Sequence, residues 1–417
     1  MKISEIKPEV YQMAERAQAV CLERFAEIDQ IAEVNTRRIM EAFQEQRVSD
    51  SCFAGTTGYG YDDLGRETLD KLYAQIFGTE AALVRLGFVN GTHALTAAMF
   101  SLAKPGETVL AVTGAPYDTL RSAIGLSGEL FGSLKFYGID YAQVDLAADG
   151  NPDYEAIRRA AADSKVAGIM IQRSRGYEDR KALTVEEIGR ICKTVREVNA
   201  SASIMVDNCY GEFTDVLEPT HVGADLIAGS LIKNPGGGLA PTGGYIAGRA
   251  ELVERAAMRM TTPGIGGECG STLGNNRLLF QGLFMAPHVV AQALKTAVFC
   301  AAMMAELGID TSPGVQEKRS DIIQMVKLGS PERMKRFCLG IQSGAPVDSF
   351  VTPEPWPMPG YDCPVIMAAG AFVQGSSIEL SADGPMREPF TVYMQGGLTY
   401  ESGKYGIMMA VSAMLDE

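Results

Sequence analysis

The sequence of 417 residues predicts an α/β fold, in which helices flank a mostly parallel sheet and a smaller α+β domain follows. Between residues 130 and 230, short apolar runs alternate with helical patterns, which is typical of βαβ units. The run at 204–206 is apolar throughout, as in a strand that is buried on both faces. After residue 310, an amphipathic helix near 331–339 and strands near 365–371, 377–380 and 390–394 predict the smaller domain.

The first part of the chain is expected to form a helical arm, because apolar residues recur at helical spacing between residues 4 and 46. A glycine- and tyrosine-rich segment at 53–65 interrupts this pattern. The elements expected next are a helix at 67–77, a turn around Gly91 that opens a helix at 94–102, and a strand at 108–112.

The middle of the chain is expected to supply most of the sheet. Its predicted strands lie at 135–137, 166–172, 204–206, 224–228 and 245–247, and its predicted helices at 153–162 and 185–199. The apolar segment 273–307 predicts one or two helices broken by Pro287. We therefore divide the chain into an N-terminal arm (1–58), a large domain (59–305) and a small domain (306–417) that packs with the arm.

Composition and charge exclude several classes of function. The net charge is −14, so no general attraction to nucleic acid or to anionic membranes is expected. The first residues do not resemble a signal peptide, and no apolar run is judged long enough to span a membrane, so we expect a cytoplasmic protein. The eight cysteines lack a C-x-x-C pair and the three histidines lie far apart, so free thiols and no metal site are expected.

Two reactive side chains follow two of the predicted buried strands. Asp207 ends the strand at 204–206, and Lys233 comes shortly after the strand at 224–228. Ligands of open α/β sheets bind at the carboxyl ends of the strands, and burial there favours a neutral, nucleophilic lysine. A lysine that binds an aldehyde, facing an acid that keeps a ring nitrogen protonated, is what pyridoxal phosphate (PLP) requires. A solvated lysine beside the glycine-rich run 236–244 is the alternative interpretation.

Several other residues are weaker candidates for the same site. Gly91 and Thr92 open a helix whose backbone amides favour a phosphate, although Asn-Gly-Thr also fits a plain helix cap. Tyr117 follows a strand and can stack on a flat ring or simply pack. Arg173 and Arg175 follow another strand, and Arg387 lies beyond a later one. Each arginine could bind a carboxylate in bidentate fashion or lie in a solvated turn.

The order of these features resembles that of fold-type I PLP enzymes. The chain resembles the cystathionine lyase and methionine γ-lyase group, and most of all its carbon–sulfur lyases involved in aluminium resistance. The residues that carry the resemblance extend from about Tyr59 to Tyr400 and include YGYDDLGRETLD, VNGTHAL, GAPYDT, VDNCYGEF, GSLIKNPGGGLAPTGGYIAGR and ADGPMREPFTVYMQGGLTY.

The resemblance implies a role for individual residues. Lys233 would be the Schiff-base lysine, Asp207 the partner of the pyridine nitrogen, and Tyr117 the residue stacked on the ring. Gly91, Thr92 and Ser230 would bind the phosphate, together with Tyr59 from a neighbouring subunit. The arginine that the family carries two residues after this tyrosine is absent, because Tyr61 occupies its position. Arg66, Arg85 or a group from another subunit would have to replace it, and Arg387 would bind the substrate carboxylate.

The implied activity is cleavage of a C–S bond in a cystathionine-, cysteine- or methionine-like amino acid by α,β- or α,γ-elimination. Sites shared between subunits imply a homodimer or homotetramer. The residues leave three alternatives: a PLP aminotransferase, a non-catalytic PLP-binding oligomer and a nicotinamide-dependent oxidoreductase. The last lacks a G-x-G-x-x-G sequence between a strand and a helix.

Overall fold

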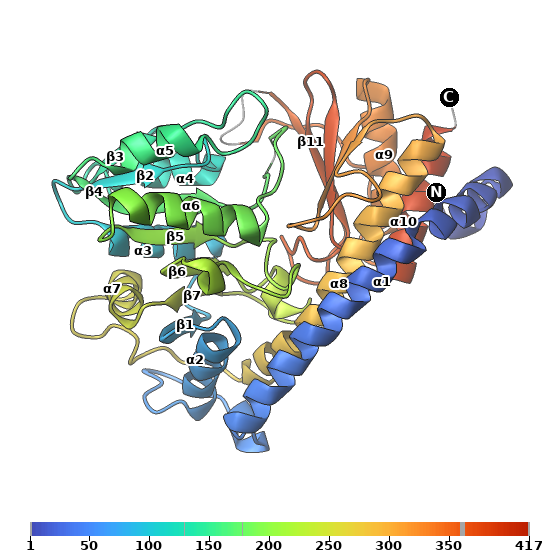
Figure 1. Ribbon diagram of the computed structural model, residues 1–417. Helices are drawn as coiled ribbons and strands as arrows, with labels where there is room; N and C mark the ends of the chain where they lie inside the picture. The colour runs from blue at the N-terminus through green and yellow to red at the C-terminus, as the bar shows by residue number, and fades with distance from the viewer. Residues whose placement is uncertain (1, 129, 177, 359–362, 416–417) are drawn as a thin grey trace.

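The computed structural model describes residues 2–128, 130–176, 178–358 and 363–415. A large α/β domain and a smaller domain lie on either side of the view in Figure 1. Two long helices, α1 (Pro8–Glu45) and α8 (Asn276–Glu306), run side by side along the edge of both domains (Figure 1). The two domains therefore share one helical support.

A seven-stranded sheet forms the centre of the large domain. Its strands lie in the order β1 (Ala81–Arg85), β7 (Gly244–Gly248), β6 (Leu226–Ser230), β5 (Ser203–Asp207), β4 (Val166–Gln172), β2 (Thr108–Ala111) and β3 (Asp140–Gln143). The strands from β6 to β3 are parallel, and only β7 runs antiparallel to both of its neighbours. The carboxyl ends of β4, β5 and β6 consequently meet at one edge of the sheet.

Both faces of this sheet are covered by apolar side chains, as the uninterrupted apolar runs predict. In β5, Met205 packs into the cluster on one face, whereas Ile204 and Val206 pack into the cluster on the other. The flanking helices are α2 (Leu64–Ile76), α3 (Gly91–Leu102), α4 (Asp118–Ile124), α5 (Tyr154–Ala161), α6 (Val185–Val198) and α7 (Ala250–Met260). Helices α3, α4 and α7 contribute to the first cluster, and α2, α5 and α6 to the second.

The small domain is an antiparallel sheet packed against two helices. Its strands lie in the order β10 (Val365–Ala369), β11 (Ser381–Pro385), β12 (Thr391–Gln395), β9 (Ile323–Lys327) and β8 (Thr311–Ser312). Helices α9 (Pro331–Gly344) and α10 (Tyr400–Met414) cover one face, and the other face turns towards the large domain (Figure 1). Short 3₁₀ helices lie at Ile3–Glu5, Asp50–Phe53, Pro219–Val222 and Asn234–Gly236.

The N-terminal arm contacts the small domain directly. The Nζ atom of Lys7 donates to the carbonyl oxygen of Leu415 at 2.7 Å, and its backbone N–H donates to the hydroxyl of Ser412. Farther along α1, Arg16 forms an ion pair with Glu306 at the end of α8. The Lys7 contacts join the start of α1 to the end of α10, the last helix of the chain, and the Arg16 contact joins α1 to α8.

Four sequence-based expectations differ from the structure. Residues 135–137 form a turn that ends at Gly138 (φ 76°), and the strand follows at 140–143. Residues 377–380 precede β11 and are not part of it. Pro287 does not break the segment 273–307, because α8 continues through it with most of its surface packed. By length and composition α8 could cross a membrane, contrary to the expectation, but 78% of its apolar window is buried inside the protein.

Candidate active site

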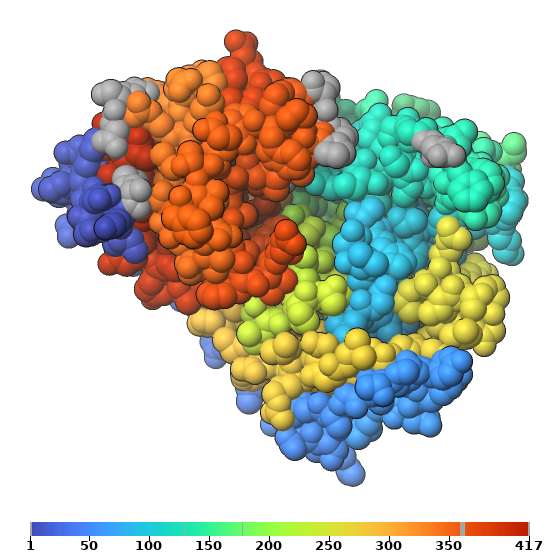
Figure 2. Space-filling model, turned by 180° about the vertical axis from the view of Figure 1, so that it is seen from behind, coloured from blue at the N-terminus to red at the C-terminus, as the bar shows by residue number. Residues whose placement is uncertain are grey.

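A cavity of about 480 Å³ lies between the two domains, at the carboxyl ends of β4, β5 and β6. The small-domain sheet forms its opposite wall. Figure 2 shows the molecule hollowed between the orange-red small domain and the cyan and green parts of the large domain. This is the position at which open α/β sheets bind ligands.

The structure brings Asp207 and Lys233 together in this cavity. Asp207 is 7% exposed, and its Oδ1 atom accepts a hydrogen bond from the backbone N–H of Cys209 at 3.1 Å. Burial raises the pKa of Asp207, although the charge of Lys233 and the hydrogen bond from Cys209 oppose this shift. The positive charge of Lys233 and the amide of Cys209 are therefore the main groups that stabilise the carboxylate form in this buried position.

Lys233 lies three residues beyond β6, with its Nζ atom 3.9 Å from the centre of the Tyr210 ring. Burial alone lowers the pKa of Lys233, as the sequence interpretation assumed. The acidic groups around the amine, which are Cys209, Tyr210, Asp207 and Tyr117, raise the pKa further than burial lowers it, so the net shift is upward. The direction of this net shift is opposite to the one expected from burial alone.

The glycines after Lys233 allow the backbone to pack closely. A Cβ atom on Gly236 would lie 1.7 Å from the carbonyl oxygen of Leu231. One on Gly237, whose φ is 54°, would lie 2.3 Å from the carbonyl oxygen of Gly282 in α8. Side chains cannot be accommodated at these two positions, so the tight loop that follows Lys233 requires glycine.

The start of α3 supplies a site suited to an anion. Asn90 caps the helix, and its side chain accepts from the backbone N–H of His93 at 2.9 Å. Gly91 and Thr92 line the cavity beside Ser230, whose Cβ atom lies 3.1 Å from the position of a Cβ on Gly91. The Oγ1 atoms of Thr92 and Thr119 lie 2.8 Å apart. Helix cap and anion site are therefore compatible here, since the first amides of a helix remain available to a phosphate.

Tyr117 lies on the β2 side of the cavity. Its backbone N–H donates to the Oε1 atom of Gln172 at 3.1 Å, and Gly176 approaches its ring so closely that a Cβ there would lie 3.4 Å away. The ring is half-buried and faces the same cavity as Lys233.

The structure does not bring Arg173 and Arg175 to the cavity. Alternation along the extended chain places Gln172, Ser174 and Gly176 in the cavity wall and turns the two arginines away from it. Arg173 is fully buried and pairs with Glu218 at 3.3 Å. The guanidinium group of Arg175 donates to the hydroxyl of Ser312.

The remaining candidates also lie outside the cavity lining. Arg387 is exposed in the turn between β11 and β12. Arg66 donates to backbone carbonyl groups of 60, 268 and 270, and Arg85 pairs with Asp70 at 2.8 Å. Tyr59 is 74% exposed and stacks on Tyr61. Neither arginine can therefore serve a phosphate at Gly91 in this chain, and Tyr59 faces outward.

Several lining residues were missed by the sequence interpretation. Tyr210 belongs to the D-N-C-Y segment that also contains Asp207, so the sequence could have indicated it. Strand alternation could have indicated Gln172. Ser377, Ser381, Asp383 and Gln395 come from the small domain. No sequence pattern indicates which face of an antiparallel sheet will meet another domain.

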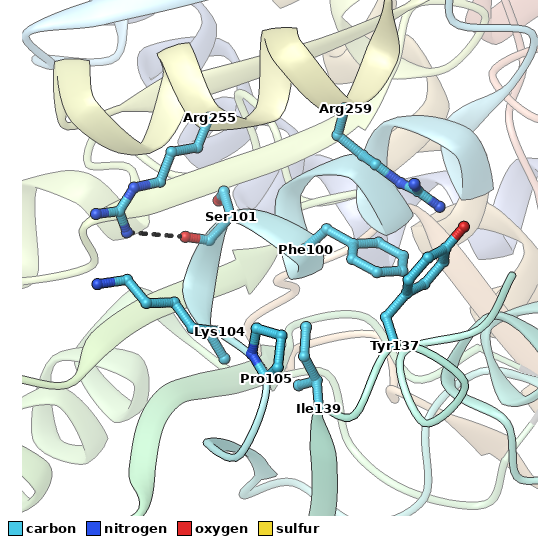
Figure 3. A pocket seen from close by; sticks show the side chains of 9 residues that line it. Phe100, Ser101, Lys104, Pro105, Tyr137, Ile139, Arg255 and Arg259 are labelled. Atoms are coloured by element: carbon cyan, nitrogen blue, oxygen red, sulfur yellow. Dashed lines mark hydrogen bonds between the residues drawn. The ribbon is translucent and has the colours of Figure 1, made fainter. Parts of the chain in front are cut away.

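A second pocket of about 300 Å³ lies at the far end of α3. Figure 3 shows Lys104 and Arg255 on one side of it and Arg259 beside Phe100 and Tyr137 on the other. The guanidinium carbon of Arg259 lies 4.0 Å from the centre of the Phe100 ring. The described residues that line this pocket include no acidic side chain, so it lacks the acid–amine pair of the larger cavity.

Comparison with known proteins identifies the family. The sequence model of methionine gamma-lyase matches residues 10–415. The chain belongs to the methionine gamma-lyase family. The chain is 50% identical over 392 residues to the YnbB protein of Bacillus subtilis, covering 94% of this chain and 93% of that protein. It is 27% identical over 214 residues to L-methionine gamma-lyase of Pseudomonas putida, covering 50% of this chain and 48% of that enzyme.

Solved structures agree with this membership. The chain is 51% identical to a carbon–sulfur lyase involved in aluminum resistance from Clostridium novyi, with a TM-score of 0.94 and coverage of 98% of this chain and 96% of that one. The PLP-dependent protein YhfS of Escherichia coli shares the fold alone, at 16% identity and a TM-score of 0.64, with 94% and 97% covered.

Proposed function

We propose that this protein is a PLP-dependent carbon–sulfur lyase that cleaves a sulfur amino acid by α,β- or α,γ-elimination. One observation carries the proposal: the Lys233 amine and the Asp207 carboxylate face one cavity that also contains the amide end of α3. The name of the relative from Clostridium novyi supports C–S cleavage.

The residues of the cavity fit the cofactor. Lys233 would hold its aldehyde carbon, Asp207 its ring nitrogen, and Tyr117 one face of its ring. The amides of Gly91 and Thr92 and the hydroxyl of Ser230 would hold its phosphate. When bound, PLP supplies an electron sink for a carbanion at the substrate Cα.

The chain's own groups would manage the protons. The Nζ atom of Lys233, once it has lost its own proton, would take the Cα proton, and Asp207 would keep the ring nitrogen protonated. A γ-elimination also moves a Cβ proton, for which Lys233 and the hydroxyl of Tyr117 are the candidates. The choice between β and γ positions rests on the substrate's placement against the small-domain wall.

The charge balance supports a shared site. Among the described residues that line the cavity, Lys233 is the only cation, whereas Asp207 and Asp383 are acids. A phosphate and a substrate carboxylate need further cations. We infer a homodimer or homotetramer in which a neighbouring subunit completes the site through the loop of Tyr59. Arg387 could meet the substrate carboxylate after a shift of its exposed turn.

A spectrum and an assay test this proposal. Purified protein is expected to show visible absorbance that borohydride abolishes, and to release thiol and keto acid from cystathionine, cysteine or methionine. Lys233→Ala is expected to lose both properties, while exposed Lys193→Ala serves as the matched control. Retained turnover in Lys233→Ala would exclude the proposed role of Lys233. Amino transfer to a keto acid without thiol release would identify an aminotransferase instead.

The expected location is the cytoplasm. All eight cysteines are free thiols, and six of them are buried. Such usage suits a reducing compartment, which supports this location.

A further inference from the structure

The side chain of Tyr210 connects the reactive amine to the small domain. Its ring lies 3.9 Å from the Lys233 Nζ atom, and its hydroxyl lies 3.1 Å from the hydroxyl of Ser377. Ser377 belongs to the small domain and lines the same cavity. One side chain therefore contacts both the amine and the opposite wall.

The backbone at Tyr210 is held in an unfavourable conformation. Its φ is 71°, a left-handed value that residues with a Cβ atom rarely adopt. Such conformations persist where the surroundings fix them, and they gather at functional sites. Here Gly211 follows and donates its backbone N–H to the carbonyl oxygen of Asn208 at 2.9 Å. This turn is what aims the Tyr210 ring at Lys233.

A neighbouring serine makes a second connection of the same kind. The hydroxyl of Ser376, which is 4% exposed, donates to the carbonyl oxygen of Ile232 at 2.9 Å. Ile232 precedes Lys233 in the chain. The consecutive serines Ser376 and Ser377, here called the serine pair, thus hold the lysine through its backbone and through the ring beside its amine.

We propose that Tyr210 is a positioning residue for the Lys233 amine and that the serine pair ties this amine to the small domain. The placement of the small domain then sets where the amine points. Met367, Ser381 and Gln395 of the small domain also line the cavity. A substrate bound there would therefore contact the same domain that holds the lysine in place. The role of the amine itself rests on the proposed function, whereas its attachment to Tyr210 does not.

The ring and the hydroxyl of Tyr210 act differently on the amine. The face of an aromatic ring attracts an ammonium group and so favours the protonated amine. The hydroxyl bond to Ser377 fixes the plane of the ring without touching the amine. Lys233 is surrounded by the titratable groups Cys209, Tyr210, Asp207, Glu212 and Tyr117, and Asp383 faces the cavity from the small domain.

The first experiment measures the pKa of Lys233 in the full chain without cofactor, by NMR of ¹³C-labelled lysine assigned with Lys233→Ala. In Tyr210→Leu this pKa is expected to fall by about half a unit or more. Tyr210→Phe keeps the ring and is expected to leave the pKa unchanged, and exposed Tyr405→Leu is the control. An unchanged pKa in Tyr210→Leu, or an equal fall in Tyr210→Phe, would overturn the ring's role.

The second experiment tests the connection to the small domain in the PLP-loaded enzyme. Tyr210→Phe and Ser377→Ala are each expected to lower kcat by about tenfold. Because both changes remove the same hydrogen bond, the double variant is expected to lose no more than either single variant. Affinity for PLP and thermal stability should stay near wild type. Additive losses would refute the connection. If the protein lacks lyase activity, the titration of Lys233 still tests the role of Tyr210. Failure of the proposed function can therefore be distinguished from failure of the proposed role of Tyr210.

Discussion

Glu212 illustrates how burial fixes a charge state at the scale of one residue. It is fully buried, and its Oε1 atom accepts from the hydroxyl of Tyr245 at 2.8 Å. Its Oε2 atom has no hydrogen-bond partner among the described residues. Burial raises the pKa of Glu212 to about 8, so the carboxyl group is mostly protonated at neutral pH.

This raised pKa predicts a loss of stability as pH rises from about 4.5 to about 8. Between the ordinary value of 4.5 and about 8, the folded chain keeps a proton that the unfolded chain releases. The free energy of unfolding therefore falls as pH rises, by up to about 1.4 kcal/mol per pH unit. Glu212→Gln should remove this loss, which melting curves at pH 6 and pH 8 can measure. The control Glu155→Gln changes an exposed side chain and should lose stability between pH 6 and pH 8 as the wild type does. If Glu212→Gln lost as much stability as the wild type over this range, the loss could not be attributed to Glu212.

Individual site residues could be predicted from the sequence where a reactive side chain follows a predicted buried strand. Asp207 and Lys233 were found because an acid and an amine follow buried apolar runs, and the structure places both in one cavity. Arg173 and Arg175 were placed near the right strand but on its other side, because a shift of one residue reverses the direction of a side chain. The upward shift in the pKa of Lys233 depends on Cys209 and Tyr210, whose proximity no spacing reveals.

At the scale of elements, α8 is the main support of both domains. Leu294 is 2% exposed in this helix, which packs against α1 and α10. Leu294→Ala is expected to lower the free energy of unfolding by about 2–5 kcal/mol, because it leaves a cavity in a packed core. Leu22→Ala on α1 removes the same atoms from a side chain that is 60% exposed. Chemical denaturation should show little effect of that control, and equal losses in both variants would contradict the packing argument.

Most elements were predictable because their apolar periodicity is clear, as in the strand at Val166–Gln172 and the helix that begins at Val185. The strand predicted at 135–137 was wrong. Its aromatic residues are common in strands, but Phe136 and Tyr137 are exposed in a turn. Pro287 suggested a break that the surrounding packing prevents. Contacts distant in sequence override local preference at Pro287, whereas the turn at 135–137 is closed by local backbone hydrogen bonds such as that from Gly138 to Lys135.

At the scale of the whole molecule, the proposed shared site predicts complementation between two inactive variants. Lys233→Ala removes the amine, and Tyr59→Ala removes the exposed ring proposed to serve a neighbouring subunit. In mixed dimers one site carries both changes and the other carries neither, so mixing should restore about a quarter of wild-type activity. Unfolding and refolding the two variants together, followed by the thiol assay, measures this. Activity that stays at the level of the separate variants would show that each site is built from one chain.

The bond between Lys7 and Leu415 joins positions 408 residues apart. At the usual pace of about 5–20 residues per second, roughly 20–80 seconds of translation separate the two ends of this contact. During that time the apolar stripe of α1 emerges from the ribosome long before α10 exists to cover its end. The nascent chain must therefore be shielded from its neighbours while it is made, and rapid synthesis at high concentration is expected to favour inclusion bodies.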